Sequence, residues 1–229
     1  MWFAFDGCAI ALGGVLGGLF CKKIKSNDLA PLSIGIMLIS LVGLLENILT
    51  VSDTRVIGEH TVIVTVALVA GCAIGNLLKI EDRLAALSGR RGERSGGFLN
   101  ATLFFGIGGL QISAPILFVL EGNFFQMLLK GIIDFPFALM FGAVYGKKVS
   151  FSALPVLAGQ LLIGVLAWLF SGFISEALLC QLCSLGYLIL FFSGFNMLCP
   201  PENKIKNINF IPGMLLILLY NVFTEVVFQ

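Results

Sequence analysis

The sequence has few charged residues. Asp, Glu, Lys and Arg make up 12% of its 229 residues, about half of the roughly 25% that is usual in soluble domains. Hydrophobic residues make up 58%, and the mean hydropathy is +1.02. This composition excludes an ordinary soluble domain and predicts an integral membrane protein with several crossings. The net charge of +1 gives no basis for a nucleic-acid partner.

Histidine is nearly absent. His60 is the one histidine in the chain, which leaves little material for a zinc site or a Ser-His-Asp triad. Neither an HExxH nor a GxSxG motif occurs. An intramembrane enzyme is therefore the least favoured class, and we expect no catalytic residue and no cofactor.

The six cysteines lie in or beside apolar runs, where a thiol acts mostly as a small hydrophobic group. Cys180 and Cys183 form a CxxC motif near the start of an apolar run, but no second CxxC lies nearby. Metal or redox use of this pair is the alternative interpretation. We expect a packing role and no bound metal.

The N-terminal segment lacks the charge order of a cleavable signal peptide. Such a peptide carries positive charge before its apolar core, whereas here Asp6 comes first and Lys22, Lys23 and Lys25 follow. We expect this segment to stay in the protein as a membrane helix.

Eight apolar segments of 18 to 25 residues can be distinguished, each long enough to cross a bilayer as a helix. They are Trp2–Cys21, Pro31–Leu49, Thr61–Leu78, Phe98–Leu120, Phe124–Lys148, Phe151–Phe170, Ala177–Leu198 and Ile208–Phe228. A polar loop, 79–97, with an amphipathic start separates the third from the fourth. The predicted fold is all-α, with about eight transmembrane helices.

The basic residues give the orientation. If eight helices cross, all but two of the 14 Lys and Arg residues fall in loops on one side. The exceptions are Arg55, on the other side, and Lys130, inside the fifth segment. The positive-inside rule makes the basic side cytoplasmic. We therefore expect a multi-pass protein of the plasma or inner membrane with both termini outside the cytoplasm.

Weak self-similarity suggests an internal repeat. The first and fifth segments end in GGLFCKK and GAVYGKK, and each is followed after a short loop by PLSIGIMLIS or PVLAGQLLIG. Asn76-Leu77-Leu78 near the end of the third segment resembles Asn196-Met197-Leu198 near the end of the seventh. The pattern predicts two parallel four-helix halves, 1–120 and 121–229. Duplicated structural proteins would show the same pattern.

Two charged residues lie inside the fifth segment. Lys130 and Asp134 are four residues apart, so a helix places them on one face. A charge at the centre of a spanning helix costs about 2.5–3.5 kcal/mol on insertion scales, and such residues commonly line solute or ion paths. The alternatives are a self-satisfied packing pair and a Lys130 side chain that snorkels to the interface.

Six further polar residues in apolar runs are candidates for the same path. The fourth segment is rich in Gly and carries Pro115, so a broken helix there is one interpretation and close packing of small residues is the other. For Asp6 the alternative is an interfacial carboxylate at a helix N-terminus, and for the amides it is an interhelical hydrogen bond. The candidates are Asn100, Gln111, Gln160, Asp6, Asn76 and Asn196.

The order of four motifs resembles a known family. GCAIALGGVLGGLF is followed by GCAIGNLLKIEDRLAAL, GGFLNATLFFGIGGLQI and LLKGIIDFPFALMFGAVYG. This order, over nearly the whole chain, resembles the uncharacterised prokaryotic membrane proteins of the YqgA/YdfK type, domain of unknown function 554. The spacing of Lys130 and Asp134 matches that family's KxxxD motif. The resemblance implies a fold and a membrane location but no substrate.

The sequence thus favours a membrane transporter or channel for a small solute or ion, with Lys130 and Asp134 where the halves meet. The alternative is a non-catalytic scaffold or accessory subunit. Gly13 and Gly17 form a GxxxG face, as do Gly14 and Gly18, which suits contact within one chain or in a homo-oligomer. The expected partners are the lipid bilayer and the transported solute or ion.

Overall fold

The computed structural model describes residues 2–20, 30–50, 54–87, 98, 101–102, 104–106 and 109–228. These residues are almost entirely helical and include no strand, so the predicted all-α class is confirmed. The α-helices are α1 (Trp2–Phe20), α2 (Ala30–Thr50), α3 (Thr54–Leu78), α4 (Ile80–Leu87), α6 (Gly109–Glu121), α7 (Phe125–Tyr145), α8 (Ala153–Leu169), α9 (Glu176–Leu198) and α10 (Ile211–Phe228). The short 3-10 helices are η2 (Lys147–Ser152), η3 (Ser171–Phe173), η4 (Pro201–Asn203) and η5 (Asn207–Phe210).

Within these residues, five helices are long and apolar enough to cross a membrane. They are Ile57–Leu78, Phe125–Tyr145, Lys147–Leu169, Glu176–Leu198 and Asn207–Thr224. Shorter apolar helices occupy the remaining three predicted segments, at Phe3–Leu19, Ser33–Leu49 and Leu110–Glu121. The apolar helices were thus found where the sequence predicted them. The count of eight crossings stays a prediction, because length and composition support five.

The polar loop and the fourth segment are described only in part. The amphipathic start of the polar loop forms α4, as predicted, and residues 88–97 of the loop lie outside the described residues. The fourth segment is described without interruption only from Gly109, with Pro115 inside α6. The hypothesis of a break before Gly109 therefore falls largely on residues that the structure does not describe.

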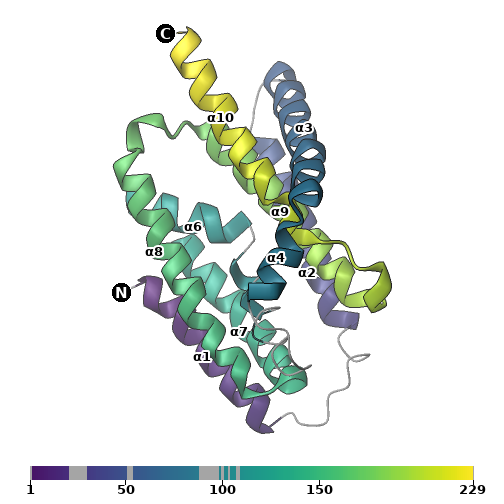
Figure 1. Ribbon diagram of the computed structural model, residues 1–229. Helices are drawn as coiled ribbons and strands as arrows, with labels where there is room; N and C mark the ends of the chain where they lie inside the picture. Colours follow the sequence, from purple (N-terminus) through teal and green to yellow (C-terminus); the bar gives the residue numbers. More distant parts are fainter. Residues whose placement is uncertain are drawn as a thin grey trace.

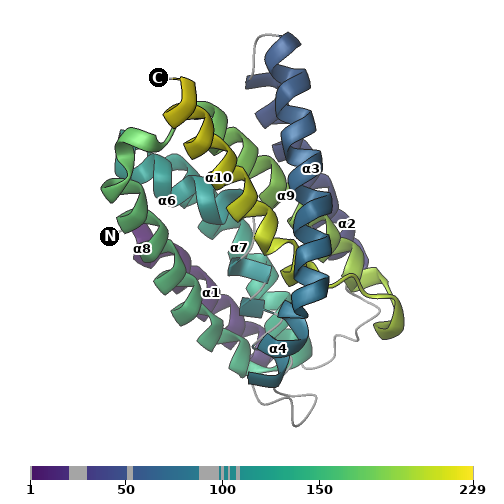
Figure 2. The ribbon, with the colours of Figure 1, turned by 45° about the horizontal axis from the view of Figure 1, so that its top comes forward.

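The helices form two groups, which Figures 1 and 2 show from two directions. The first group contains α1, α6, α7 and α8, and the second contains α2, α3, α9 and α10. Each group has a buried apolar cluster, one around Phe104 and Phe141 and one around Leu185 and Ile217. The groups touch where α6 meets α9 and where Ile36 of α2 enters the first cluster.

Both predicted halves of the sequence contribute to each group. The boundary between 1–120 and 121–229 falls at the turn from α6 to α7, where Gly122 has a φ of 69°. The first group combines α1 and α6 with α7 and α8, while the second combines α2 and α3 with α9 and α10. The four-plus-four repeat stays a prediction, since similar order along the chain is its only support.

The glycines of α1 make its close contact with α7. A Cβ atom at Gly17 would collide with the carbonyl oxygen of Leu139, and one at Gly13 would meet the carbonyl oxygen of Phe135 at 2.6 Å. Small residues let helix backbones approach in this way. The GxxxG face of α1 is therefore used inside the chain.

Neighbouring helices run in the relative directions that alternating crossings require. Asp6 near the start of α1 lies beside Lys130 near the start of α7, and Gly17 near the end of α1 lies beside Leu139. α1 and α7 are therefore parallel, as the first and fifth of a series of crossings would be. By the same kind of contact, α2 is antiparallel to α9 and α3 is antiparallel to α10.

Candidate functional site

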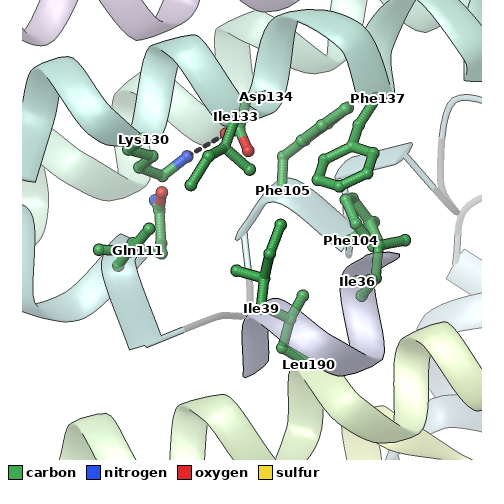
Figure 3. A pocket seen from close by; sticks show the side chains of 11 residues that line it. Ile36, Ile39, Phe104, Phe105, Gln111, Lys130, Ile133, Asp134, Phe137 and Leu190 are labelled. Atoms are coloured by element: carbon green, nitrogen blue, oxygen red, sulfur yellow. Dashed lines mark hydrogen bonds and ion pairs between the residues drawn. The ribbon is translucent and has the colours of Figure 1, made fainter. Parts of the chain in front are cut away.

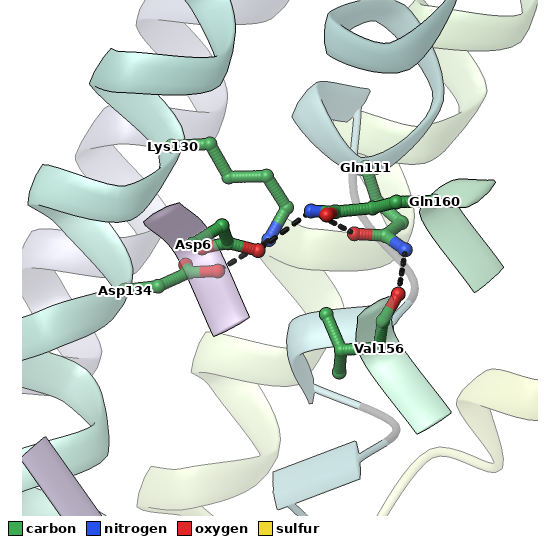
Figure 4. Close-up of polar contacts among 6 residues, drawn as sticks. All are labelled: Asp6, Gln111, Lys130, Asp134, Val156 and Gln160. Carbon is green, nitrogen blue, oxygen red and sulfur yellow. Dashed lines mark hydrogen bonds and ion pairs between the residues drawn. The ribbon is translucent and has the colours of Figure 1, made fainter. Parts of the chain in front are cut away.

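Lys130 of α7 is the centre of a buried charged cluster. Its Nζ donates a hydrogen bond to Asp6 Oδ2 of α1 at 2.9 Å, and a second to Asp134 Oδ2 one turn further along α7. The three side chains converge from two helices (Figure 4). Lys130 is 3% exposed, Asp134 is 7% exposed and Asp6 is fully buried. The Lys130 side chain is thus held inside the helix bundle, which rules out snorkelling in this conformation.

Two glutamines extend the cluster to α8 and α6. Gln160 Nε2 lies 2.6 Å from Asp6 Oδ2 and 3.4 Å from Gln111 Oε1. Gln111 Nε2 in turn donates to the carbonyl oxygen of Val156 at 3.2 Å. Figure 4 shows this chain running from Asp134 to Val156. Four helices of the first group therefore meet through one polar network.

Local sequence explains why Asp6 reaches Lys130. The spacing of four puts Lys130 and Asp134 on one face of α7, and the parallel contact of α1 brings Asp6 to the same level. Gly131 is required at this level, because a Cβ atom there would lie 2.6 Å from the Phe5 ring and 3.4 Å from Asp6 Cα. The glycines of α1 and Gly131 of α7 together permit the close approach of the two helices.

The cluster holds two acidic groups and one basic group. Asp6, Asp134 and Lys130, each in its ionised form, carry a formal charge of −1. Two buried oxygens, Asp6 Oδ1 and Gln160 Oε1, have no hydrogen-bond partner among the described residues. Burying an unpaired polar atom costs about 1–3 kcal/mol, and burying an uncompensated charge costs more. A site that retains both has the properties of a binding site for something positive or for a hydrogen-bond donor.

A cavity of about 40 Å³ lies against this cluster. Lys130, Asp134 and Gln111 form its polar side, and the other side is apolar, as Figure 3 shows. The lining residues come from both helix groups. The first group contributes Phe104 and Phe105, Leu110 and Gln111 of α6, and Lys130, Ile133, Asp134 and Phe137 of α7. The second group contributes Ile36 and Ile39 of α2 and Leu190 of α9. This volume holds about one to three water molecules. The charged cluster thus faces a small hollow at the boundary between the groups.

The structure brings together five of the eight residues predicted from the sequence. Lys130, Asp134, Asp6, Gln160 and Gln111 form the network just described. Asp6 is fully buried against neighbouring helices, and the alternative of an interfacial carboxylate at a helix N-terminus stays open. Lys130 and Asp134 are not a self-satisfied pair, because Asp6 shares the ammonium group.

The remaining three candidates lie elsewhere. Asn100 is outside the described residues. Asn196 binds the backbone of Ile205 through both its oxygen and its nitrogen, at 2.7 and 2.6 Å. Asn76 accepts a hydrogen bond from Asn209 at 2.6 Å. Asn76 and Asn196 thus fasten the segment between α9 and α10 to the helix ends.

Two further buried polar pairs join α9 to its neighbours. His60 of α3 lies 3.1 Å from Ser184 Oγ of α9, and Asn221 of α10 donates to Gln181 of α9 at 2.8 Å. All four side chains are buried. An interhelical hydrogen bond was the expected role of Asn221, whereas the sequence pattern singled out neither Gln181 nor Ser184 as a partner.

Metal ligands do not gather among the described residues. No group of three or more His, Cys, Asp or Glu side chains there is arranged to hold a metal ion. Cys180 and Cys183 are free thiols, one half-buried and the other buried.

Comparison with known proteins agrees with the membrane interpretation. The chain is 24% identical over 216 residues to the uncharacterized membrane protein YdfK of Bacillus subtilis (strain 168), covering 93% of this chain and 91% of that protein. Together with the five apolar helices, this similarity indicates a multi-pass membrane protein. No solved structure matches the chain. Residues 3–222 match the family described as "Protein of unknown function (DUF554)", and the chain therefore belongs to the DUF554 family.

Proposed function

We propose that this protein is a membrane transporter or channel for a small solute or ion, and that the solute or ion passes the Asp6–Lys130–Asp134 cluster. The observation that carries the proposal is a buried cluster of two carboxyl groups and one ammonium group beside a cavity at the boundary of two helix groups. Ionisable residues inside membrane helices commonly mark paths for ions and solutes. Transporters also tend to bind their substrates where two bundles meet, near the midplane.

The small cavity indicates how such a protein would work. A space of about 40 Å³ is too small for most metabolites. A larger solute would therefore reach Lys130 and Asp134 when the two helix groups separate along the apolar side of the cavity. Rocking of one bundle against another is a common way for transporters to open alternately to each side.

The alternative of a scaffold or accessory subunit receives less support. Its expected sign was a glycine face left exposed for dimerisation, together with a dry core. The glycines of α1 instead pack on α7 and η2 within the chain, and a charged cluster lies beside the core cavity.

Reconstitution tests the proposal. The purified protein in liposomes would be exposed to concentration jumps of single inorganic ions and of pooled small solutes, while charge movement and uptake are recorded. We expect a signal that is lost in Asp134→Asn and retained in Asp82→Asn. The second variant is the matched control, because it also replaces a carboxylate by an amide, but at a half-exposed ion pair between Asp82 and Lys206. Wild-type protein that moves nothing above empty liposomes would refute the proposal.

A further inference from the structure

The cluster has one negative charge more than it has positive charges when all three groups are ionised. Lys130 provides one ammonium group for two carboxylates, Asp6 and Asp134, and both contact it through an Oδ2 atom. An isolated negative charge is costly inside a protein and more so inside a membrane. The cluster therefore favours one additional cation or proton at this place.

The cluster offers too few oxygen ligands for a metal cation. Alkali and alkaline-earth ions need about six oxygen ligands, whereas the ammonium group of Lys130 already occupies the point where the carboxylates converge. Among the described residues that line the cavity, Asp134 and Gln111 alone carry a side-chain oxygen. The others are Ile, Leu, Phe and Lys130, and Lys130 itself repels a cation. A proton needs neither space nor a ligand shell, since it binds one carboxylate oxygen directly.

The geometry distinguishes the two carboxylates. Asp6 accepts hydrogen bonds from both Lys130 and Gln160 and does not line the cavity. Asp134 is bound by Lys130 and lines the cavity. Asp134 and Asp6 both bind the same Lys130 Nζ atom, which brings the two carboxyl groups close together. A protonated Asp134 gains a donor O–H, and two carboxyl groups held close together characteristically share one proton.

We propose that the Asp6–Asp134 pair binds one proton, carried on Asp134, and that this proton is the ion coupled to transport. Binding converts the Asp134 carboxylate to a carboxylic acid and changes the cluster charge from −1 to 0. The charged groups that face Asp134 from the packed helices are Asp6 of α1 and Lys130 of α7. α6 and α8 contribute the neutral Gln111 and Gln160, and α2 and α9 contribute apolar side chains. One to three waters in the cavity would bring the proton to Asp134.

This inference rests on the proposed transport function for its role but not for its detection. Infrared difference spectroscopy of the lipid-reconstituted protein, recorded against pH, reports the C=O stretch of a protonated carboxyl group without any flux. We expect the wild type to show such a band near neutral pH and Asp134→Asn to lose it. Asp6→Asn should lose it too, because the remaining Asp134–Lys130 pair is neutral without a proton. Asp82→Asn should keep it.

Two further measurements keep the test decisive. If Asp134→Asn does not fold, Asp134→Glu retains a carboxyl group at a different depth, so a shift in the band supports the assignment and an unmoved band contradicts it. Addition of NaCl or KCl at constant pH should leave the band unchanged. Loss of the band would show that a metal cation displaces the proton, and it would contradict the inference. Wild-type and variant spectra that superimpose would also overturn the inference. Absence of flux with an intact band would overturn the proposed transport function and the coupling role of the proton, while proton binding at Asp134 would stand.

Discussion

Lys130 Nζ lies 2.9 Å from Asp6 Oδ2, although the two residues are 124 positions apart in the sequence. This contact turns a pair on one helix into a three-residue cluster shared by α1 and α7. It also determines the charge balance of the site, because two carboxyl groups then share one ammonium group. The proposed function and the inferred proton site both depend on this relationship.

Lys130→Met should destabilise the protein by about 3–5 kcal/mol, because it leaves two buried carboxylates close together without a cation. The double variant Lys130→Met/Asp6→Asn restores the formal charge of −1 and removes the repulsion. We expect it to be more stable than Lys130→Met alone. Thermal unfolding in detergent, followed by circular dichroism, measures both. Equal stability of the single and double variants would show that Asp6 and Asp134 do not repel each other when Lys130 is absent.

Gly17→Ala should destabilise the contact of α1 with α7 by about 1–3 kcal/mol, the usual cost of overpacking. The new Cβ would overlap the carbonyl oxygen of Leu139, and backbone atoms cannot move aside as a flexible side chain can. Gly35→Ala is the matched control, since nothing lies within 4 Å of the Cβ position there. That control should unfold at the wild-type temperature or slightly above it, because alanine favours a helix by up to about 1 kcal/mol. Two equally stable variants would contradict the close approach.

Asn196→Ala should lower stability and leave transport intact. The side chain binds both the N–H and the C=O of Ile205, and each backbone group left unpaired costs about 1–3 kcal/mol when buried. Flux per folded molecule, after correction for the amount of folded protein, should equal that of the wild type. A variant that folds normally and loses flux would place Asn196 in the solute path, as the sequence prediction had it.

The orientation of the chain is a separate prediction. A C-terminal alkaline phosphatase fusion should be active and a C-terminal green fluorescent protein fusion dark, because the positive-inside rule places both termini outside the cytoplasm. A phosphatase fusion after Asn203, in the segment that carries Lys204 and Lys206, should show the opposite result. The reverse pattern would contradict the predicted orientation, and two fusions with the same result would contradict an odd number of crossings between the two points.

The sequence predicts the helices well because length and apolarity determine them. The fifth segment was predicted at Phe124–Lys148, and α7 spans Phe125–Tyr145. The seventh was predicted at Ala177–Leu198, and α9 spans Glu176–Leu198. Apolar runs of about 20 residues leave few alternatives to a helix in a membrane.

Contacts between helices were harder to predict. Spacing along one helix identified Lys130 and Asp134, but nothing periodic links Asp6 to them. The glycines of α1 signalled a close contact without naming α7 as the partner. Asn76 and Asn196 looked similar to Gln160 in the sequence, yet the backbone that returns between α9 and α10 binds Asn196, and Asn209 from that stretch binds Asn76. Such differences arise from tertiary packing, which a single sequence does not encode by spacing.

The most direct test of the account is charge movement by the purified protein in liposomes on a solid-supported membrane. After a jump in proton concentration, alone and with pooled small solutes, we predict a transient current for the wild type and for Asp82→Asn. Asp134→Asn, reconstituted at the same density and with the same helical content, should give none. An unchanged current in Asp134→Asn would contradict the claim that ions or solutes pass the Asp6–Lys130–Asp134 cluster.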